Sequence, residues 1–176
     1  MELFDKAFNI TLNNEGGFSN DKYDPGGATK YGITEETLKQ YDASLNIRSI
    51  SKDTAKHIYK TNYWTKAHCD EIAKINNSLA ILLFDSGVNI GIKTSTKILQ
   101  TTINAFYHDP IAVDGYIGQK TLFALNLCIL KNKESFLDAY IAGWRCHYIT
   151  LTKNNDKLKK FINGWMNRVR KTVASL

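Results

Sequence analysis

Proline is scarce in this chain of 176 residues, which contains only Pro25 and Pro110. Long stretches therefore lack the residue that breaks helices most strongly. The apolar residues recur mainly at helical spacing rather than in alternation, so the sequence predicts a mostly α protein. No internal repeat, low-complexity tract or flexible linker is evident. The chain is long enough to bury one sizeable core, or one lobe with a smaller helical appendage.

Long apolar runs are also missing. A run such as Leu79 to Phe84 is far shorter than the roughly 20 residues that span a bilayer, so we expect no integral membrane segment. The opening MELFDKAF has neither a basic n-region nor an apolar h-region. We therefore expect synthesis in the cytoplasm without a signal peptide, and any role outside the cytoplasm would need a separate export route.

Cysteine is too rare, and odd in number, for a disulfide framework. Cys69, Cys128 and Cys146 leave at least one thiol unpaired, which favours a reducing site of synthesis. His68-Cys69 and Cys146-His147 form two short clusters, but adjacent residues rarely both point to one tetrahedral zinc site. The sequence therefore predicts no metal site, and Cys128 is expected to be a buried apolar residue rather than a nucleophile.

Acidic residues are outnumbered by basic ones. The net charge is +6 and the pI is near 9.1, which favours an anionic partner such as nucleic acid, anionic lipid or cell-wall polymer. The basic residues gather only at KLKK (157–160) and NRVRK (167–171), where the plain interpretation is a solvated helical face. Because no recognition motif or basic-aromatic platform is present, we expect no nucleic-acid partner.

The helical pattern can be divided into segments. Apolar residues of positions 3–11 share one face of a first helix, which Gly16 and Gly17 should end. A short hairpin is possible before Thr34, which should cap a second helix. Further helices are predicted from Ser51 or Lys52 to about Trp64, over 77–90, over 93–106, on either side of Asn132, and over 157–173. The turn-rich segment near 109–118 predicts a lobe over 1–108 and a smaller helical region over 109–176.

An acidic, glycine-rich segment follows the first predicted helix. Glu15 directly precedes Gly16 and Gly17, at a helix C-terminus whose negative dipole end favours a protonated carboxyl, as apolar shielding by Phe18 also would. The paired glycines leave room for a bulky polymer. Asp24 lies nine positions further on. A protonated acid with an ionised carboxylate is the pair that hydrolyses glycosidic bonds, whereas a solvated helix end followed by an ordinary turn is the structural alternative.

Several stretches together resemble one family. The spacing of Glu15, Asp24 and Thr29 resembles the Glu-Asp-Thr arrangement of phage-type lysozymes. The stretch EGGFSNDKYDPGGATKYGIT is closer to the Glu-Gly-Gly-Tyr signature of glycoside hydrolase family 108, with Phe18 in place of Tyr. YKTNYWTKAHCDEI (59–72) and LLFDSGVNIGIKTSTKILQ (82–100) resemble later segments of that family. VDGYIGQKT (113–121) and FINGWMNRV (161–169) resemble its predicted peptidoglycan-binding region.

The resemblance implies a lysozyme-like helical lobe and a function. The family comprises N-acetylmuramidases, including phage endolysins and muramidases dedicated to secretion. The implied reaction is cofactor-free hydrolysis of the β-1,4 bond between N-acetylmuramic acid and N-acetylglucosamine, with Glu15 as general acid. Asp24 would activate or position a water, or stabilise positive charge on the sugar. Thr29 would hold that water or act as a local cap, and Asp21 is the rival second carboxylate or a turn-forming side chain.

The resemblance also implies substrate contacts. Asp85 and Asn89 share one face of an apolar helix, where they either hold the catalytic loop by hydrogen bonds or contact substrate. Aromatic side chains could stack on sugar rings, although Trp64 could equally pack in the core, as Trp144 and Trp165 are expected to do. The candidate substrate-binding residues are Asn20, Asp21, Tyr31, Tyr63, Trp64, Asp85 and Asn89.

The expected partner is the glycan strand of peptidoglycan, acted on in the periplasm or outside the cell. A phage holin or a secretion apparatus would provide the export route, and the sequence makes no prediction about oligomeric state. The alternative function is a non-catalytic wall-binding or secretion-scaffold protein with the same fold, which would bind sacculi without releasing reducing ends.

Overall fold

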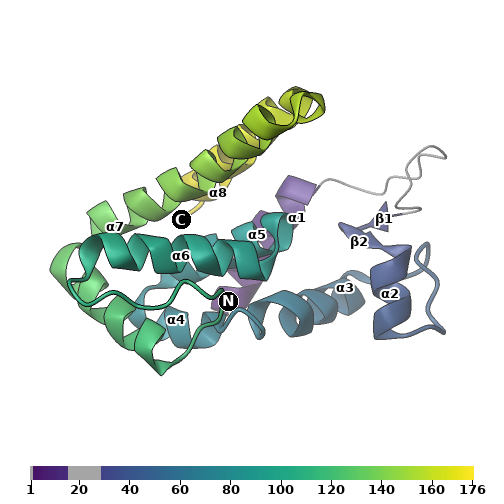
Figure 1. Cartoon of the computed structure of the whole chain (residues 1–176). Helices are drawn as coiled ribbons and strands as arrows, with labels where there is room; N and C mark the ends of the chain where they lie inside the picture. Colours follow the sequence, from purple (N-terminus) through teal and green to yellow (C-terminus); the bar gives the residue numbers. More distant parts are fainter. Residues whose placement is uncertain (1, 16–28) are drawn as a thin grey trace. The chain divides into compact units, whose positions relative to one another are not determined.

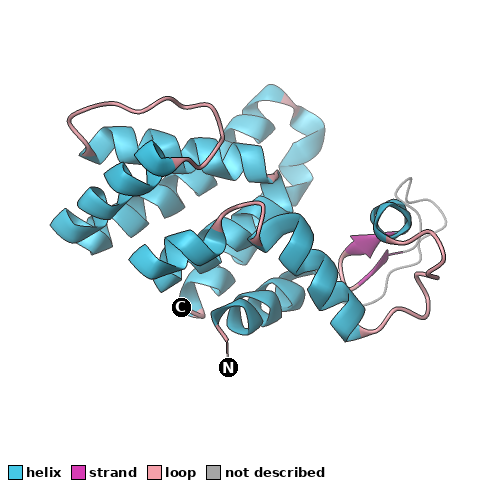
Figure 2. Cartoon of the chain, turned by 90° about the horizontal axis from the view of Figure 1, so that it is seen from below, coloured by secondary structure: helices cyan, strands magenta, loops and turns pink. Residues whose placement is uncertain are grey.

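The structure is a computed structural model of the chain, and it describes residues 2–15 and 29–176 (Figure 1). The chain divides into two compact units, residues 1–62 and residues 63–176. Helices dominate both units, and the sheet formed by the described residues has two short strands (Figure 2). The predicted mostly α, lysozyme-like fold is confirmed. Within the described ranges, no helix combines the length and the apolar character needed to cross a membrane.

The first unit opens with helix α1 (Leu3–Glu15). The face predicted from the sequence is the one that packs, since Phe4, Ala7, Phe8 and Thr11 are all buried. The predicted hairpin is also present, with strand β1 (Thr29–Lys30) antiparallel to β2 (Ile33–Thr34). Its two turn residues both have positive φ, which is the conformation of the two-residue turns that match strand twist.

Two further helices of this unit begin at capping side chains, of which Thr34 was the cap expected from the sequence. The Thr34 side chain accepts a hydrogen bond from the Thr37 backbone N–H and caps α2 (Glu35–Tyr41). The Ser51 side chain does the same for Thr54 at the start of α3 (Lys52–Tyr59). A π-helical turn, η1 (Lys60–Trp64), continues α3 and crosses the boundary between the two units.

The second unit is built around helix α5 (Asn77–Ile90), whose residues 79–87 are all buried. This confirms the expected central helix. It is preceded by α4 (Cys69–Ile75) and followed by α6 (Ile92–Phe106), α7 (Gln119–Asn154), a 3-10 segment η2 (Asp156–Phe161) and α8 (Ile162–Ala174). Helix α4 was not expected from the sequence. The last helix was predicted from residue 157, but its first turn is 3-10 rather than α.

Helix α7 consists of two straight parts that meet at Asn132. Asn132 has non-helical backbone angles (φ −161°, ψ 88°), and its side chain accepts a hydrogen bond from the Ser135 N–H at 3.0 Å, as an N-cap residue does. The predicted interruption at this residue is therefore confirmed. The second part then runs back past α6, where the rings of Phe106 and Phe136 lie 5.5 Å apart (Figure 1).

Two α6 side chains fix the turn-rich segment between α6 and α7. The Asn104 amide bonds both the N–H and the carbonyl of Ile111, each at 2.9 Å. The Gln100 amide accepts from the Gly115 N–H at 2.8 Å and donates to Asp114 Oδ1 at 2.7 Å. The latter bond is the main reason that the pKa of the Asp114 carboxyl is lowered. This segment is an ordered part of the second unit.

Candidate active site

In the sequence, the candidate catalytic residues of the first unit run from the end of α1 to the start of the hairpin. Helix α1 ends at Glu15, as the sequence predicted, so the backbone of the proposed acid is at a helix C-terminus. Thr29 begins β1, opposite Thr34. The side chain of Glu15 and residues 16–28 lie outside the described residues, and with them the candidates Asn20, Asp21 and Asp24.

Tyr59 of α3 connects these two flanking elements. Its ring packs edge-on against Phe8 of α1, with the ring centroids 5.4 Å apart. Its hydroxyl donates a hydrogen bond to the backbone carbonyl of Tyr31 in the hairpin turn, at 3.1 Å. The Tyr59 side chain is buried. One side chain thus holds α1 and the hairpin to the same helix.

The hairpin turn carries the candidate aromatic residue Tyr31. Its backbone has φ of 56°, an uncommon conformation for a residue with a side chain. The neighbouring Lys30 ammonium donates to the Arg48 carbonyl at 2.9 Å and lies 5.5 Å from the centre of the Tyr31 ring. The ring is half-buried, so part of its surface is accessible to a ligand. Thr29 is also half-buried.

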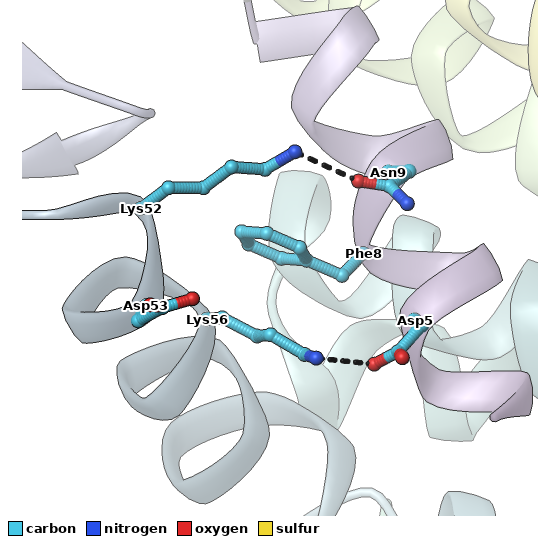
Figure 3. Close-up of a pocket in the computed structure, with 6 residues that line it drawn as sticks. All are labelled: Asp5, Phe8, Asn9, Lys52, Asp53 and Lys56. Carbon is cyan, nitrogen blue, oxygen red and sulfur yellow. Dashed lines mark hydrogen bonds and ion pairs between the residues drawn. The ribbon is translucent and has the colours of Figure 1, made fainter. Parts of the chain in front are cut away.

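A cavity of about 230 Å³ lies between α1 and α3. Figure 3 shows its polar pairs: Lys56 forms an ion pair with Asp5, and Lys52 donates to Asn9 Oδ1 at 3.1 Å beside Phe8. The hydrogen bond to Asp5 raises the pKa of Lys56. These pairs fasten the N-terminal part of α1 to α3. We assign this cavity a structural role, because Lys52 and Lys56 of α3 bond side chains of α1 across it.

In the second unit, Asp85 holds helix α8 against α5. The Asp85 carboxylate is fully buried, and Arg168, which is 8% exposed, donates to it from Nη2 at 2.7 Å and from Nε at 3.1 Å. The Thr172 hydroxyl donates to the same carboxylate at 2.8 Å. A fully buried carboxylate that accepts these hydrogen bonds is not accessible to a polymer. The geometry corresponds to a structural hydrogen-bonding role for Asp85 rather than to substrate contact, but among the described residues the element that it holds is α8 and not the catalytic loop.

Trp64 is likewise part of the core. It is 1% exposed, its indole N–H donates to Asp70 Oδ1 at 2.7 Å, and its ring lies edge-on to Phe84. This is the core-packing alternative rather than sugar stacking. Its neighbour Tyr63 is half-buried. Of these two adjacent aromatic candidates, only Tyr63 therefore has exposed surface that a ligand can contact.

Asn89 lies at the end of a chain of aromatic hydrogen bonds. The buried Trp144 indole donates to the Tyr148 hydroxyl at 2.9 Å, which in turn donates to Asn89 Oδ1 at 2.6 Å. The Trp165 ring stacks on Tyr148 with centroids 5.0 Å apart. Asn89 is an exposed residue, so its amide can still face a ligand while Tyr148 fixes its orientation.

Two residues that organise these sites, Arg168 and Tyr59, were not predicted from the sequence. Arg168 belongs to a basic segment interpreted as a solvated face, and this was wrong for Arg168, although Arg170 and Lys171 are exposed. A lone acidic residue in an apolar helix is the signal that a buried cation is needed elsewhere. No feature of the sequence around Tyr59 indicated its contacts with α1 and the hairpin. In the described ranges, His, Cys, Asp and Glu side chains form no cluster of three or more suited to a metal ion.

Comparison with known proteins identifies both parts of the chain. Residues 8–91 match the family Glycosyl hydrolase 108, and residues 94–170 match the Predicted Peptidoglycan domain. Among solved structures, the chain is similar to SagA of Brucella abortus, with 27% sequence identity and a TM-score of 0.74 over 98% of this chain and 92% of that one. No curated protein matches the chain. The predicted resemblance is confirmed: residues 8–91, just under half of the chain, match glycosyl hydrolase 108, and residues 94–170 match a predicted peptidoglycan domain.

Proposed function

We propose that the protein is a peptidoglycan hydrolase that cleaves the β-1,4 bond between N-acetylmuramic acid and N-acetylglucosamine, with Glu15 as the general acid. The family match supports a glycoside hydrolase, and the second domain supports peptidoglycan as the substrate. The observation that carries the choice of Glu15 is its position as the last residue of α1, directly before Gly16 and Gly17.

This position suits a proton donor. The negative end of the α1 dipole disfavours a second negative charge, so it favours the protonated carboxyl that must donate to the leaving glycosidic oxygen. Such a donor also has to be held in place. The contact between Phe8 and Tyr59 fixes α1 two turns before Glu15, and the ion pair between Lys56 and Asp5 fixes its first turns.

The second catalytic group comes from the segment that follows. In this proposal Asp24 positions the attacking water or stabilises positive charge on the sugar, with Asp21 as its rival. Thr29 holds the water from the start of β1. Because the Tyr59 hydroxyl fixes the adjoining turn, Thr29 and Tyr31 belong to a hairpin that is anchored to α3.

Substrate contact is assigned to exposed or half-buried candidates. Tyr31 and Tyr63 offer aromatic surface on which a sugar ring can stack, and Asn89 offers an amide. Asn20 and Asp21 are proposed to contact the glycan from the loop. The predicted division into a catalytic lobe over 1–108 and a binding region over 109–176 stays a prediction. Export through a holin or a secretion apparatus, and action on the wall outside the cytoplasm, are part of the same proposal.

The test is hydrolysis of purified sacculi by full-length protein. Released muropeptides are analysed by mass for reducing-end N-acetylmuramic acid, comparing wild type with Glu15→Gln and with the matched control Glu36→Gln, an exposed residue of α2. We expect hydrolysis by wild type and the control but not by Glu15→Gln. A folded Glu15→Gln protein that still releases these ends would exclude Glu15 as the acid. A wild-type protein that binds sacculi without hydrolysis would favour the wall-binding alternative.

A further inference from the structure

An open groove of about 470 Å³ lies between α6 and the second part of α7. Its lining includes Lys97, Ile98 and Thr101 from α6 and Ala139, Gly143 and His147 from α7. These residues belong to the second unit, whereas Glu15 belongs to the first. None of them takes part in the proposed hydrolysis.

Small residues create this groove. The two helices approach so closely that a Cβ atom on Gly143 would lie 2.9 Å from the Ile98 Cγ2 atom, so Gly143 permits the contact. Ala139 lies one helical turn before Gly143 and fills little of the space above the contact. The Thr102 hydroxyl donates back to the Ile98 carbonyl at 2.9 Å, so its polar group is already satisfied. The floor of the groove is therefore largely apolar.

The polar groups of the groove favour an anionic ligand. Lys97 contributes an ammonium group, Thr101 a hydroxyl and His147 an imidazole, and the described residues that line the groove include no acidic side chain. Partial burial lowers the pKa of His147, which leaves the imidazole neutral at pH 7 with one N–H donor. A ligand that fits would combine small apolar groups with a carboxylate.

The position of the groove in the sequence narrows the choice of ligand. All of its lining residues lie between positions 94 and 147, inside the predicted peptidoglycan domain. Peptidoglycan offers two chemically different ligands. The glycan is rich in hydroxyls and is usually held by aromatic faces, whereas the stem peptide carries alanine methyl groups and free carboxylates. Lining residues that are small, apolar and basic match the stem peptide better.

We propose that this groove is a binding site for the stem peptide of peptidoglycan, with the alanine methyl groups over Ala139 and Gly143 and a carboxylate at Lys97. The proposal rests on the proposed function only in taking peptidoglycan as the polymer that the protein meets. It gives the second unit a recognition role that is separate from bond cleavage.

The direct test is isothermal titration of the full-length protein with a soluble stem tetrapeptide, L-Ala-γ-D-Glu-diaminopimelate-D-Ala, which contains no glycosidic bond. Lys97→Met removes the ammonium but keeps most of the aliphatic stem, and its control is Lys74→Met, an exposed lysine of α4. Ala139→Leu fills the groove, and its control is Ala142→Leu, an exposed position of the same helix. Circular dichroism checks the fold of each variant.

We expect tetrapeptide binding by wild type and both controls. Lys97→Met should bind at least about tenfold more weakly, the loss typical of a hydrogen bond to a charged group, and Ala139→Leu should show no binding. Absence of tetrapeptide binding by wild type, or a folded Lys97→Met protein with wild-type affinity, would overturn the proposal. If Ala139→Leu fails to fold, the exposed Lys97 position decides the outcome alone.

A parallel assay separates this inference from the proposed function. Peptide-free glycan strands, prepared by amidase digestion of sacculi, contain the scissile bond without the proposed groove ligand. Wild type and Lys97→Met should hydrolyse these strands at equal rates, whereas Lys97→Met should adsorb less to intact sacculi. Hydrolysis without tetrapeptide binding would refute the proposed ligand of the groove and leave the catalytic proposal intact. Tetrapeptide binding that depends on Lys97, without hydrolysis of either substrate, would refute the catalytic proposal alone.

Discussion

Removing the buried cation at Arg168 should destabilise the protein strongly. Arg168→Met keeps an unbranched apolar stem but leaves the Asp85 carboxylate, which is fully buried, without the two hydrogen bonds at 2.7 and 3.1 Å. Breaking such a pair by removing one partner costs about 3–5 kcal/mol. In a chain of this size each kcal/mol lowers Tm by roughly 2–4 °C, so we expect a loss of roughly 6–20 °C.

The measurement is thermal unfolding followed by circular dichroism at fixed pH and salt. The control is Arg170→Met, an exposed position two residues further along α8, which should change the unfolding free energy by less than about 0.5 kcal/mol. A double variant, Asp85→Leu with Arg168→Met, should regain much of the loss because it leaves no unpaired buried charge. If Arg168→Met is as stable as the control, Asp85 does not depend on this pair, and the structural role assigned to it would be wrong.

Three further predictions concern single positions. Tyr59→Phe keeps the ring contact with α1 but loses the hydrogen bond to Tyr31, so it should lower the free energy of unfolding by about 1 kcal/mol. It should also slow sacculus hydrolysis well below the wild-type rate. Unchanged hydrolysis would argue against a hairpin positioned by this bond. Gly115→Ala should be destabilising by more than about 1 kcal/mol in urea unfolding, because φ is +84° and a Cβ atom would lie 2.6 Å from the Lys93 Cγ atom. Gly118→Ala, where a Cβ atom meets nothing within 4 Å, is its control, and equal effects of the two substitutions would contradict this account. A thiol reagent at pH 8 should modify Cys146 rapidly and the other two cysteines only after unfolding, because burial shields their thiols and raises their pKa; fast modification of more than one thiol in the native protein would contradict the structure.

Local signals predicted most of the helical segments. The cap residue Thr34, the apolar run of α5 and the interruption at Asn132 all act within a few residues of the backbone that they shape. Helix α4 was missed for the converse reason. It has only seven residues, and His68 before it adopts a left-handed conformation without a side-chain cap hydrogen bond. A short helix of this kind is maintained by packing, so its sequence carries no start signal.

Only part of the candidate site could be predicted from the sequence. The sequence located Glu15 at the end of the first helix, and it named Asp85 and Trp64 with two alternatives for each. It could not choose between those alternatives, because exposure depends on which helices pack around a side chain. Asp85 is buried because α8 covers it, and Trp64 is buried beside Phe84 of α5.

By itself, the sequence determined the family, the mostly α fold, most of the helices and the position of the proposed acid, because each depends on residue type and short-range spacing. Only the tertiary structure decided which side chains meet. Asp85 and Arg168, which form a buried ion pair, are 83 residues apart in the sequence, and Tyr59 and Tyr31 are 28 apart. The groove between α6 and α7 depends on Gly143, which has no side chain and so lets α7 lie against Ile98. Such contacts follow from how whole helices pack, and helical periodicity does not specify the partner of a given face.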